Sequence, residues 1–174
     1  MKTVLIAFFI SMFGTLGTVA LAAEPNVAKV SLDHYSGTWL EIARRPMWIT
    51  DGCVAGFTTY HAGNSSEEIE VLDGCHDDGT PSGKLKTVKG KGHLLDADVK
   101  RAKLQVRYPF FITYNYWVLY VSPDKRWFIS ADPHLDNLWI YARRRPTKHL
   151  LSVMVRKARA LGYDVSKLEF PPAR

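Results

Sequence analysis

The chain has 174 residues, of which 47% are hydrophobic and 12% aromatic, and its formal net charge is +6. This composition predicts one globular domain with a buried core and excludes an intrinsically disordered chain. Two cysteines cannot by themselves form a structural zinc site or hold together a disulfide scaffold that lacks a core. The charge permits attraction to phosphates or anionic lipid without requiring a nucleic acid as partner.

The N-terminal segment has the pattern of an export signal. Lys2 precedes an apolar run over 4–13, and small residues then lead to Ala20-Leu21-Ala22, an A-x-A cleavage pattern. The run is shorter than the roughly 20 residues of a membrane-spanning helix. No cysteine lies near the cleavage point, so a bacterial lipid-attachment site is absent. We expect residues 1–22 to be a cleaved signal peptide and residues 23–174 to form the mature domain in an oxidising compartment.

Short strands dominate the pattern of the mature chain. In one of them, Ala102, Leu104, Val106 and Tyr108 alternate with polar residues, which is the period of a half-buried strand. Eight such segments, each bounded by Gly, Pro, Asn or Asp, predict a meander closed into a barrel or a sandwich. The predicted strands cover 39–45, 54–61, 67–74, 84–93, 102–108, 114–121, 126–131 and 137–143.

One helix follows the strands. Thr147 is placed to cap a helix that runs to about Leu161 with one apolar stripe, and Gly162 ends it. The segments 114–121 and 137–143 are apolar on both faces, so their outer side needs a cover. We therefore predict an all-β protein, an eight-stranded antiparallel up-and-down barrel with one C-terminal α-helix packed outside. The tail after the helix contains two prolines and is expected to be extended or mobile.

The two cysteines are predicted to form a disulfide. Cys53 and Cys75 are symmetric about Asn64, which lies in a turn segment between two predicted strands. In a hairpin centred on that turn the two residues lie opposite each other, within disulfide reach. Such a bridge contributes roughly 3 kcal/mol on the chain-entropy model. A reactive thiol pair is the competing interpretation, and the lack of a C-x-x-C motif disfavours it.

Three motifs resemble those of the lipocalin family. Gly37 and Trp39 form a G-x-W motif in the first mature strand, in a form similar to the bacterial branch of the family. Asp124 is the one matching residue of the family's motif between the sixth and seventh strands. Arg143 looks like the arginine that stacks on the motif tryptophan. The resemblance covers about 33–170 and implies that these four residues are structural, with Arg143 covering Trp39 at the closed end.

The resemblance implies a ligand in the barrel interior, since eight strands can enclose one small molecule. Alternation along the first, sixth and eighth strands supplies the candidate wall. An aromatic wall with one carboxylate suits a long apolar tail better than a sugar, so the expected ligand is a fatty acid or lysophospholipid. The alternative is that the aromatic side chains simply fill the core. The candidate ligand-binding residues are Glu41, Ala43, Tyr116, Val118, Tyr120, Trp139 and Tyr141.

Two apolar loops are expected beside the open end. Met47 and Trp48 lie in the loop after the first strand, and Phe110 and Phe111 lie in the loop before the sixth. Exposed apolar loops beside an opening indicate a lid, a peripheral membrane contact or a partner surface. Basic residues near the same rim, Arg44 among them, are candidates to pair with a carboxylate or phosphate headgroup.

Other chemistry is disfavoured. The six histidines are scattered without metal-ligand spacing, and no G-x-S-x-G, phosphate loop or dinucleotide fingerprint is present, so we expect no metal, cofactor or catalytic residue. The basic stretch 84–91 is interpreted as a solvated strand face, not as a nucleic-acid site. The expected function is an exported, periplasmic carrier of a small hydrophobic ligand in the cell envelope. A lipocalin-fold enzyme acting on a lipid-like substrate and an envelope protein-interaction module are the alternatives.

Overall fold

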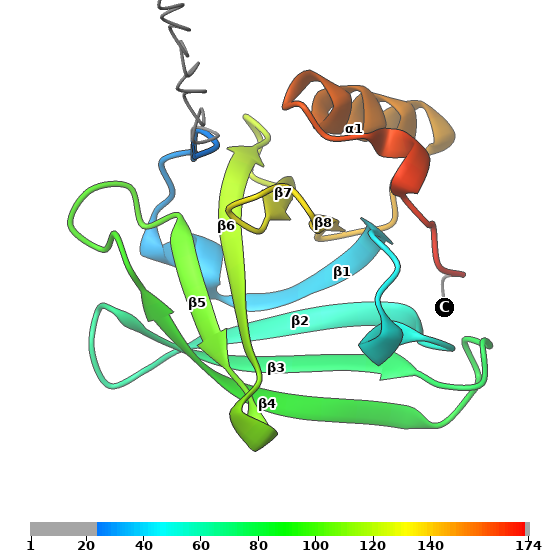
Figure 1. Ribbon diagram of the computed structural model, residues 1–174, viewed down its shortest axis with the longest axis horizontal. Coiled ribbons are helices and arrows are strands. Elements are labelled where there is room, and N and C mark those ends of the chain that lie inside the picture. Colours follow the sequence, from blue (N-terminus) through cyan, green and yellow to red (C-terminus); the bar gives the residue numbers. More distant parts are fainter. Residues whose placement is uncertain (1–23, 173–174) are drawn as a thin grey trace, which may run out of the picture.

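The computed structural model describes residues 24–172, so the predicted signal peptide 1–22 lies outside the described residues. Eight antiparallel strands form one closed barrel in which each strand pairs with its sequence neighbours and β1 pairs with β8 (Figure 1). The predicted up-and-down barrel is confirmed. The strands are β1 Gly37–Arg44, β2 Val54–Ala62, β3 Glu68–His76, β4 Leu85–Leu94, β5 Lys103–Arg107, β6 Thr113–Val121, β7 Trp127–Ala131 and β8 Leu138–Ala142.

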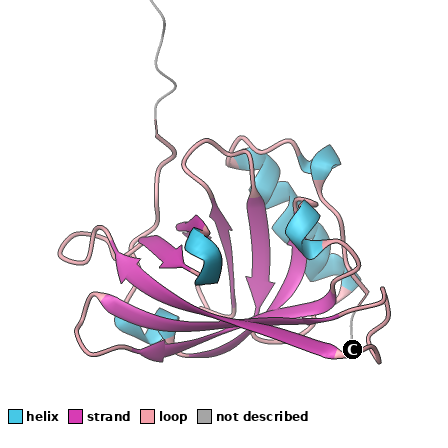
Figure 2. Ribbon diagram, turned by 60° about the horizontal axis from the view of Figure 1, so that its bottom comes forward, coloured by secondary structure: helices cyan, strands magenta, loops and turns pink. Residues whose placement is uncertain are grey.

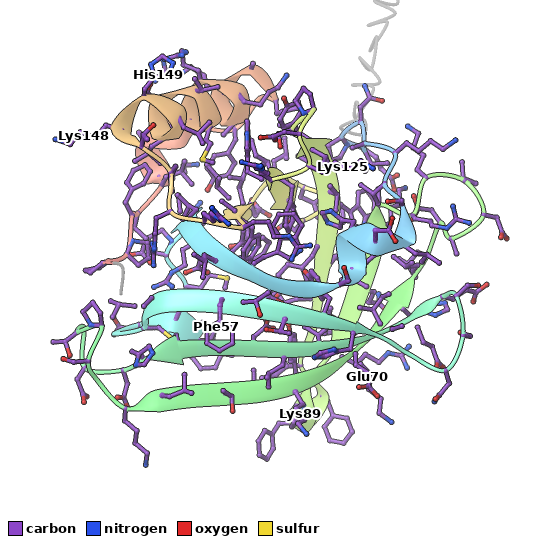
Figure 3. The ribbon with its side chains drawn as sticks, turned by 180° about the vertical axis from the view of Figure 1, so that it is seen from behind. Phe57, Glu70, Lys89, Lys125, Lys148 and His149 are labelled. Atoms are coloured by element: carbon purple, nitrogen blue, oxygen red, sulfur yellow. A yellow bond between two sulfur atoms is a disulfide. The ribbon has the colours of Figure 1, made fainter. Side chains whose placement is uncertain are left out.

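The predicted helix is α1, Lys148–Ala160, and the hydroxyl of Thr147 caps it by accepting from the Leu150 backbone N–H at 3.2 Å. Figure 2 separates the strands from the helical segments, and Figure 3 shows side chains filling the space between α1 and the strands. Within residues 24–172, no helix is long and apolar enough to cross a membrane. The short 3-10 helices are η1 Leu32–Tyr35, η2 Trp48–Thr50, η3 Pro109–Phe111 and η4 Val165–Lys167.

Two hydrophobic cores lie on opposite faces of the sheet. The inner core contains Trp39, Phe128 and Trp139 inside the barrel. The outer core joins Met154 and Ala158 of α1 to apolar residues on the outside of β1, β6, β7 and β8. The helix therefore covers the strands that are apolar on both faces, as their sequences predict.

Two predicted inward residues face outward, because strand alternation is interrupted. The β1–β8 register shifts between Glu41 and Ala43, and the β6–β7 register shifts between Val118 and Tyr120. Each irregularity moves the following residue to the other face. Ala43 and Tyr120 accordingly lie in the outer core, and the Tyr120 ring is 4.9 Å from that of Trp127. The prediction that these two side chains face the interior is wrong.

The closed end of the barrel is built around Trp39. Its ring is 1% exposed, and its indole N–H donates to the His34 carbonyl at 3.1 Å. The Arg143 guanidinium carbon lies 3.5 Å from the Trp39 ring centroid, and Arg143 donates to the Thr38 carbonyl at 3.0 Å. Gly37 has φ +63°, a conformation that favours glycine, close under the same guanidinium. The structure thus places Arg143 over Trp39, the stack that the motif resemblance implies.

The tight connection between β6 and β7 contains Asp124. Its carboxylate accepts from the Ser122 hydroxyl at 2.6 Å and from the Arg126 backbone N–H at 3.2 Å. Hydrogen bonding, with the Ser122 contact as the largest cause, lowers the pKa of Asp124. The residue therefore organises a turn at the closed end, away from the open end.

The predicted disulfide joins Cys53 and Cys75, whose Cα atoms are 5.5 Å apart. The hairpin is not centred on Asn64, because Tyr60 pairs with Val71 and a further register shift lies between Val54 and Phe57. The bridge therefore links the residue before β2 to a diagonal neighbour in β3 instead of a directly opposite one. It is predicted correctly although the assumed register is off by a few residues.

The C-terminal segment is extended and docks on the barrel. Arg44 and Glu169 exchange two backbone hydrogen bonds, of 3.2 and 2.9 Å, and form an antiparallel bridge. Ala55 donates to the Pro172 carbonyl at 2.9 Å. The chain thus returns from η4 to the start of β2, beside the loop that follows β1.

Candidate functional site

The barrel interior opens at the end opposite Trp39. Inward-facing Trp39 and Phe128 are each 1% exposed, whereas Val88, which pairs with inward-facing Asp73, is 40% exposed. Asp73, Tyr108 and Tyr116 are half-buried although they face the inside of a closed barrel. This rise in exposure shows that solvent enters the interior from the end formed by the β1–β2, β3–β4, β5–β6 and β7–β8 connections.

Five side chains form an aromatic and acidic group at this open end, which we call the mouth cluster. Successive ring centroids are 6.5, 6.2 and 4.7 Å apart along the series from Tyr108 to Trp139, and none of these pairs is stacked flat. The carboxyl group of Asp73 lies beside the first of these rings. The mouth cluster consists of Asp73, Tyr108, Tyr114, Tyr116 and Trp139.

Hydrogen bonds connect the carboxyl group to two hydroxyls. The Tyr108 hydroxyl donates to Asp73 and lies 3.2 Å from the Tyr116 hydroxyl. Burial raises the pKa of Asp73 and outweighs the opposing bond from Tyr108. Burial also raises the pKa of both tyrosines well above the ordinary value, so both hydroxyls stay protonated.

A second polar group lies at the end of β1. The Arg44 guanidinium donates to Glu41 at 2.5 Å, to Glu169 at 2.5 Å, and to the carbonyls of Thr50 and Cys53. Arg44 is 3% exposed. Burial raises the pKa of Glu41, and the charge and hydrogen bond of Arg44 oppose this rise. The expectation of a rim arginine free for a headgroup is therefore wrong for Arg44, since its donors are already engaged.

Glycine in β4 makes room for the mouth cluster. A Cβ added at Gly90 would lie 2.8 Å from the Tyr108 ring and closer still to Val106, both of which point inward. Glycine at this position therefore lets Tyr108 enter the interior and reach Asp73.

The other predicted wall residues lie inside. Glu41 is 8% exposed, and Val118, Trp139 and Tyr141 belong to the inner core, against which Tyr116 packs. Burial raises the pKa of Tyr141 well above the ordinary value. The structure brings Tyr116 and Trp139 together at the mouth, with ring centroids 4.7 Å apart. Glu41 lies against Arg44 instead.

Three members of the mouth cluster were missing from the predicted set. Asp73 follows buried Ile69 and Val71 at alternate positions, so its carboxyl group is on the apolar face of its strand. Tyr108 ends the inward alternation of its strand. Tyr114 pairs with inward-facing Val106. A carboxyl group at an apolar position was the available signal, because a buried acid needs a partner.

The predicted rim residues differ in exposure. Phe110, Phe111 and Trp48 are 91%, 103% and 79% exposed, whereas Met47 is partly buried against the inner core. Phe110 and Phe111 both have positive φ, near 60°. Bulky residues rarely adopt this conformation, and here it holds two adjacent aromatic rings in solvent.

A broad groove with a volume of about 1120 Å³ lies along β3, β4 and β5. Glu70 and Lys89, labelled in Figure 3, are among the charged residues that line it, together with Lys91 and Arg107. Tyr108 of the mouth cluster also lines this groove, so the two features adjoin at the end of β5.

The residues that the structure describes hold no group of three or more His, Cys, Asp or Glu side chains able to bind a metal ion. Both cysteines are in the disulfide, so neither supplies a free thiol.

Comparison with known proteins agrees with this architecture. Residues 30–173 match the family model described as a lipocalin-like domain. The chain is 30% identical over 158 residues to temperature-induced lipocalin-1 of Arabidopsis thaliana, covering 86% of this chain and 83% of that protein. It is 27% identical over 161 residues to putative lipocalin R877 of Acanthamoeba polyphaga mimivirus, covering 87% and 90%.

Solved structures show the same fold at low identity. Insecticyanin from the tobacco hornworm Manduca sexta superposes with a TM-score of 0.66 and 16% identity, covering 87% of this chain and 85% of that one. Lobster apocrustacyanin A1 superposes with a TM-score of 0.63 and 10% identity, covering 87% and 91%.

Proposed function

Because the chain belongs to the lipocalin family, we propose that it binds and carries a small hydrophobic ligand inside its barrel. The observation that supports this most directly is the exposure of inward-facing side chains at the open end, where Val88 is 40% exposed. A fold of this kind is typical of such binding, and the wall residues of this chain decide what is held.

The ligand class proposed is a fatty acid or a lysophospholipid. Half-buried Tyr116, which packs on buried Trp139, presents an aromatic wall on which an alkyl chain can lie, and each methylene removed from water contributes about 0.8 kcal/mol. The headgroup would remain at the open end, where Lys86 is exposed and lies 3.0 Å from Asp77. Binding of this kind uses burial and needs no catalytic group.

The proposed setting is the cell envelope of a Gram-negative bacterium, with the mature protein in the periplasm. The export pattern of residues 1–22 and the resemblance of the motifs to the bacterial branch of the family support this placement. The disulfide and the family agree with an exported protein.

We propose that the protein binds its ligand and does not catalyse a reaction. A lipocalin-fold enzyme that uses a catalytic thiol would need a free cysteine, and Cys53 and Cys75 are paired.

Peripheral membrane contact is a further part of the proposed role. Phe110 and Phe111 project from η3 at the open end, and Arg107 lies just before them in β5. Apolar rings beside a basic residue suit insertion into an anionic lipid surface. Such contact would place the opening of the barrel against the source of its ligand.

Titration of delipidated protein with fatty acids and lysophospholipids tests the binding proposal. We expect saturable binding, weakened by Trp139→Ala or Tyr116→Ala because both open the inner wall. Tyr120→Ala is the matched control, since Tyr120 is on the same strand as Tyr116 but packs against the outer core. Failure of the wild-type protein to bind any of these lipids saturably would contradict the proposal. Mass spectrometry of lipid that copurifies from the native host would then identify the natural ligand.

A further inference from the structure

The charges inside the barrel are unbalanced in favour of acids. Glu41 is paired with Arg44, whose remaining donors contact Glu169 and two carbonyls. Asp73 has no such partner. Within residues 24–172, no Lys, Arg or His nitrogen lies within 4.0 Å of its carboxyl oxygens, and a tyrosine hydroxyl donates to it instead.

Aromatic rings accompany this unpaired carboxyl group. Tyr108, Tyr114 and Tyr116 are half-buried, so a ligand that enters the mouth can reach their rings. Trp139 is 2% exposed and supports the Tyr116 ring from behind at 4.7 Å, so the accessible ring surface at the mouth belongs to the tyrosines. The negative faces of aromatic rings attract cations, and the negative charge of an adjacent carboxylate strengthens this attraction.

We propose that the mouth cluster selects ligands that carry a cationic ammonium group, either a protonated amine or a quaternary ammonium, joined to an apolar chain. The ammonium group would lie against Asp73 and the rings of Tyr108 and Tyr116, and the chain would lie along the remaining apolar wall. This inference rests on the proposed function, and of the two proposed ligand classes it favours a lysophospholipid whose headgroup carries an ammonium over a fatty acid. A carboxylate headgroup at the same place would be repelled by Asp73.

Protonation of Asp73 is coupled to this selection. Burial raises the pKa of Asp73, and a bound cation favours the ionised carboxylate, so ammonium binding is accompanied by proton release. The preference for ammonium therefore weakens as the pH falls through the pKa of the free site. The titratable groups that face Asp73 from other elements are Glu41, Tyr60, Tyr108, Tyr116 and Tyr141.

The test compares three probes with the same chain length and different headgroups. Decyltrimethylammonium, decanoate and 1-decanol are titrated by calorimetry into the delipidated protein, below the concentrations at which they form micelles. We expect decyltrimethylammonium to bind about tenfold more tightly than decanoate. Asp73→Asn should abolish that preference, because it replaces the carboxylate beside Tyr108 with an uncharged amide.

Glu70→Gln is the matched control. Glu70 lies on β3 as Asp73 does, but its side chain is exposed on the outer face (Figure 3), so its removal should change none of the three affinities. The wild-type comparison needs no substitution and stays decisive if Asp73→Asn does not fold.

The outcomes separate this inference from the function on which it rests. Equal binding of the three probes by the wild-type protein, or an ammonium preference that survives in Asp73→Asn, would overturn the headgroup selection alone. If none of the probes binds, 1-decanol included, the interior does not hold an alkyl chain and both proposals fail.

Discussion

At the closed end of the barrel, Trp39 and Phe128 pack with ring centroids 4.8 Å apart and are almost fully buried, under the Arg143 guanidinium. At the open end, Asp73, Tyr108 and Tyr116 on the same inner face are half-buried and meet through hydroxyl and carboxyl groups. The closed end contributes burial and therefore stability, whereas the open end keeps polar groups and apolar rings available for contact. Substitutions at the two ends should consequently separate stability from binding.

The largest expected effect is on stability at the closed end. Trp39→Ala should lower the free energy of unfolding by about 3–5 kcal/mol, because it removes a fully buried ring and the arginine stack above it. Urea unfolding followed by circular dichroism measures this loss. Trp48→Ala is the control at the open end, where the ring is 79% exposed, and should change stability by less than about 0.5 kcal/mol. Equal losses in the two variants would contradict the division between the ends.

Loss of the disulfide should have the next largest effect. The bridge closes a loop with a sequence separation of 22 residues, so Cys53→Ser combined with Cys75→Ser should cost roughly 3 kcal/mol on the chain-entropy model. Guanidinium unfolding of the variant and of the oxidised wild type gives the difference. Reduced wild-type protein is the control and should match the variant. An oxidised protein no more stable than the reduced one would refute a structural role for the bridge.

A pH dependence should arise at the closed end through His34. Burial, with a further contribution from the charge of Arg143, lowers the pKa of His34 from 6.5 to about 3. The unfolded chain takes up a proton on His34 that the folded protein excludes. The contribution of His34 to the free energy of unfolding is therefore fully present above pH 6.5 and is lost as the pH falls towards 3. Between pH 7 and pH 4, the free energy of unfolding of the wild type should fall by roughly 3 kcal/mol more than that of His34→Leu.

Glu41 and Asp73 act in the opposite direction. Their raised pKa values mean that the folded protein binds their protons more readily, which favours folding as the pH falls. They are present in both proteins of the His34 comparison and cancel in the difference. Near-ultraviolet circular dichroism at pH 7 checks that the variant keeps its packing. Parallel pH profiles would mean that His34 is not excluded from protonation in the folded state.

The smallest effect on stability is expected at the rim. Phe110→Gly combined with Phe111→Gly should change the free energy of unfolding by less than about 1 kcal/mol, because both rings are exposed and glycine accepts positive φ. Sedimentation with vesicles that contain anionic lipid should nevertheless show weaker association. Leu95→Ser, an exposed apolar residue at the other end, is the control and should sediment as the wild type does. Unchanged sedimentation of the double variant would remove η3 from the proposed membrane contact.

Most of the fold could be predicted because it depends on local patterns. The alternation in 102–108 and the capping of α1 by Thr147 are read from neighbouring residues, and the structure confirms both. The placement of Ala43 and Tyr120 could not be predicted in this way. A register shift is set by pairing with a distant strand, and one added residue reverses the face of all that follow.

The candidate site was predicted in part. The inward orientation of Tyr116 is predicted from the alternation of residues along its strand. That of Trp139 is predicted from the same alternation, counted from Arg143, which stacks on Trp39. Asp73 was overlooked although its place on an apolar strand face signalled a buried acid. The contacts of Arg44 had no local signal, because they depend on Glu169, which is 125 residues away in the chain.

The bridge between Arg44 and Glu169 has a consequence for synthesis of the chain. β1 is completed early, but both of the segments that cover its second half, β8 and the C-terminal segment, are made last. A nascent chain that has not reached residue 138 holds an open sheet with unpaired backbone groups at β1, which invites association with other chains. Barrel closure is therefore nearly the final event of biogenesis. C-terminal truncation should reduce the yield of folded protein, because it leaves the Arg44 end of β1 uncovered.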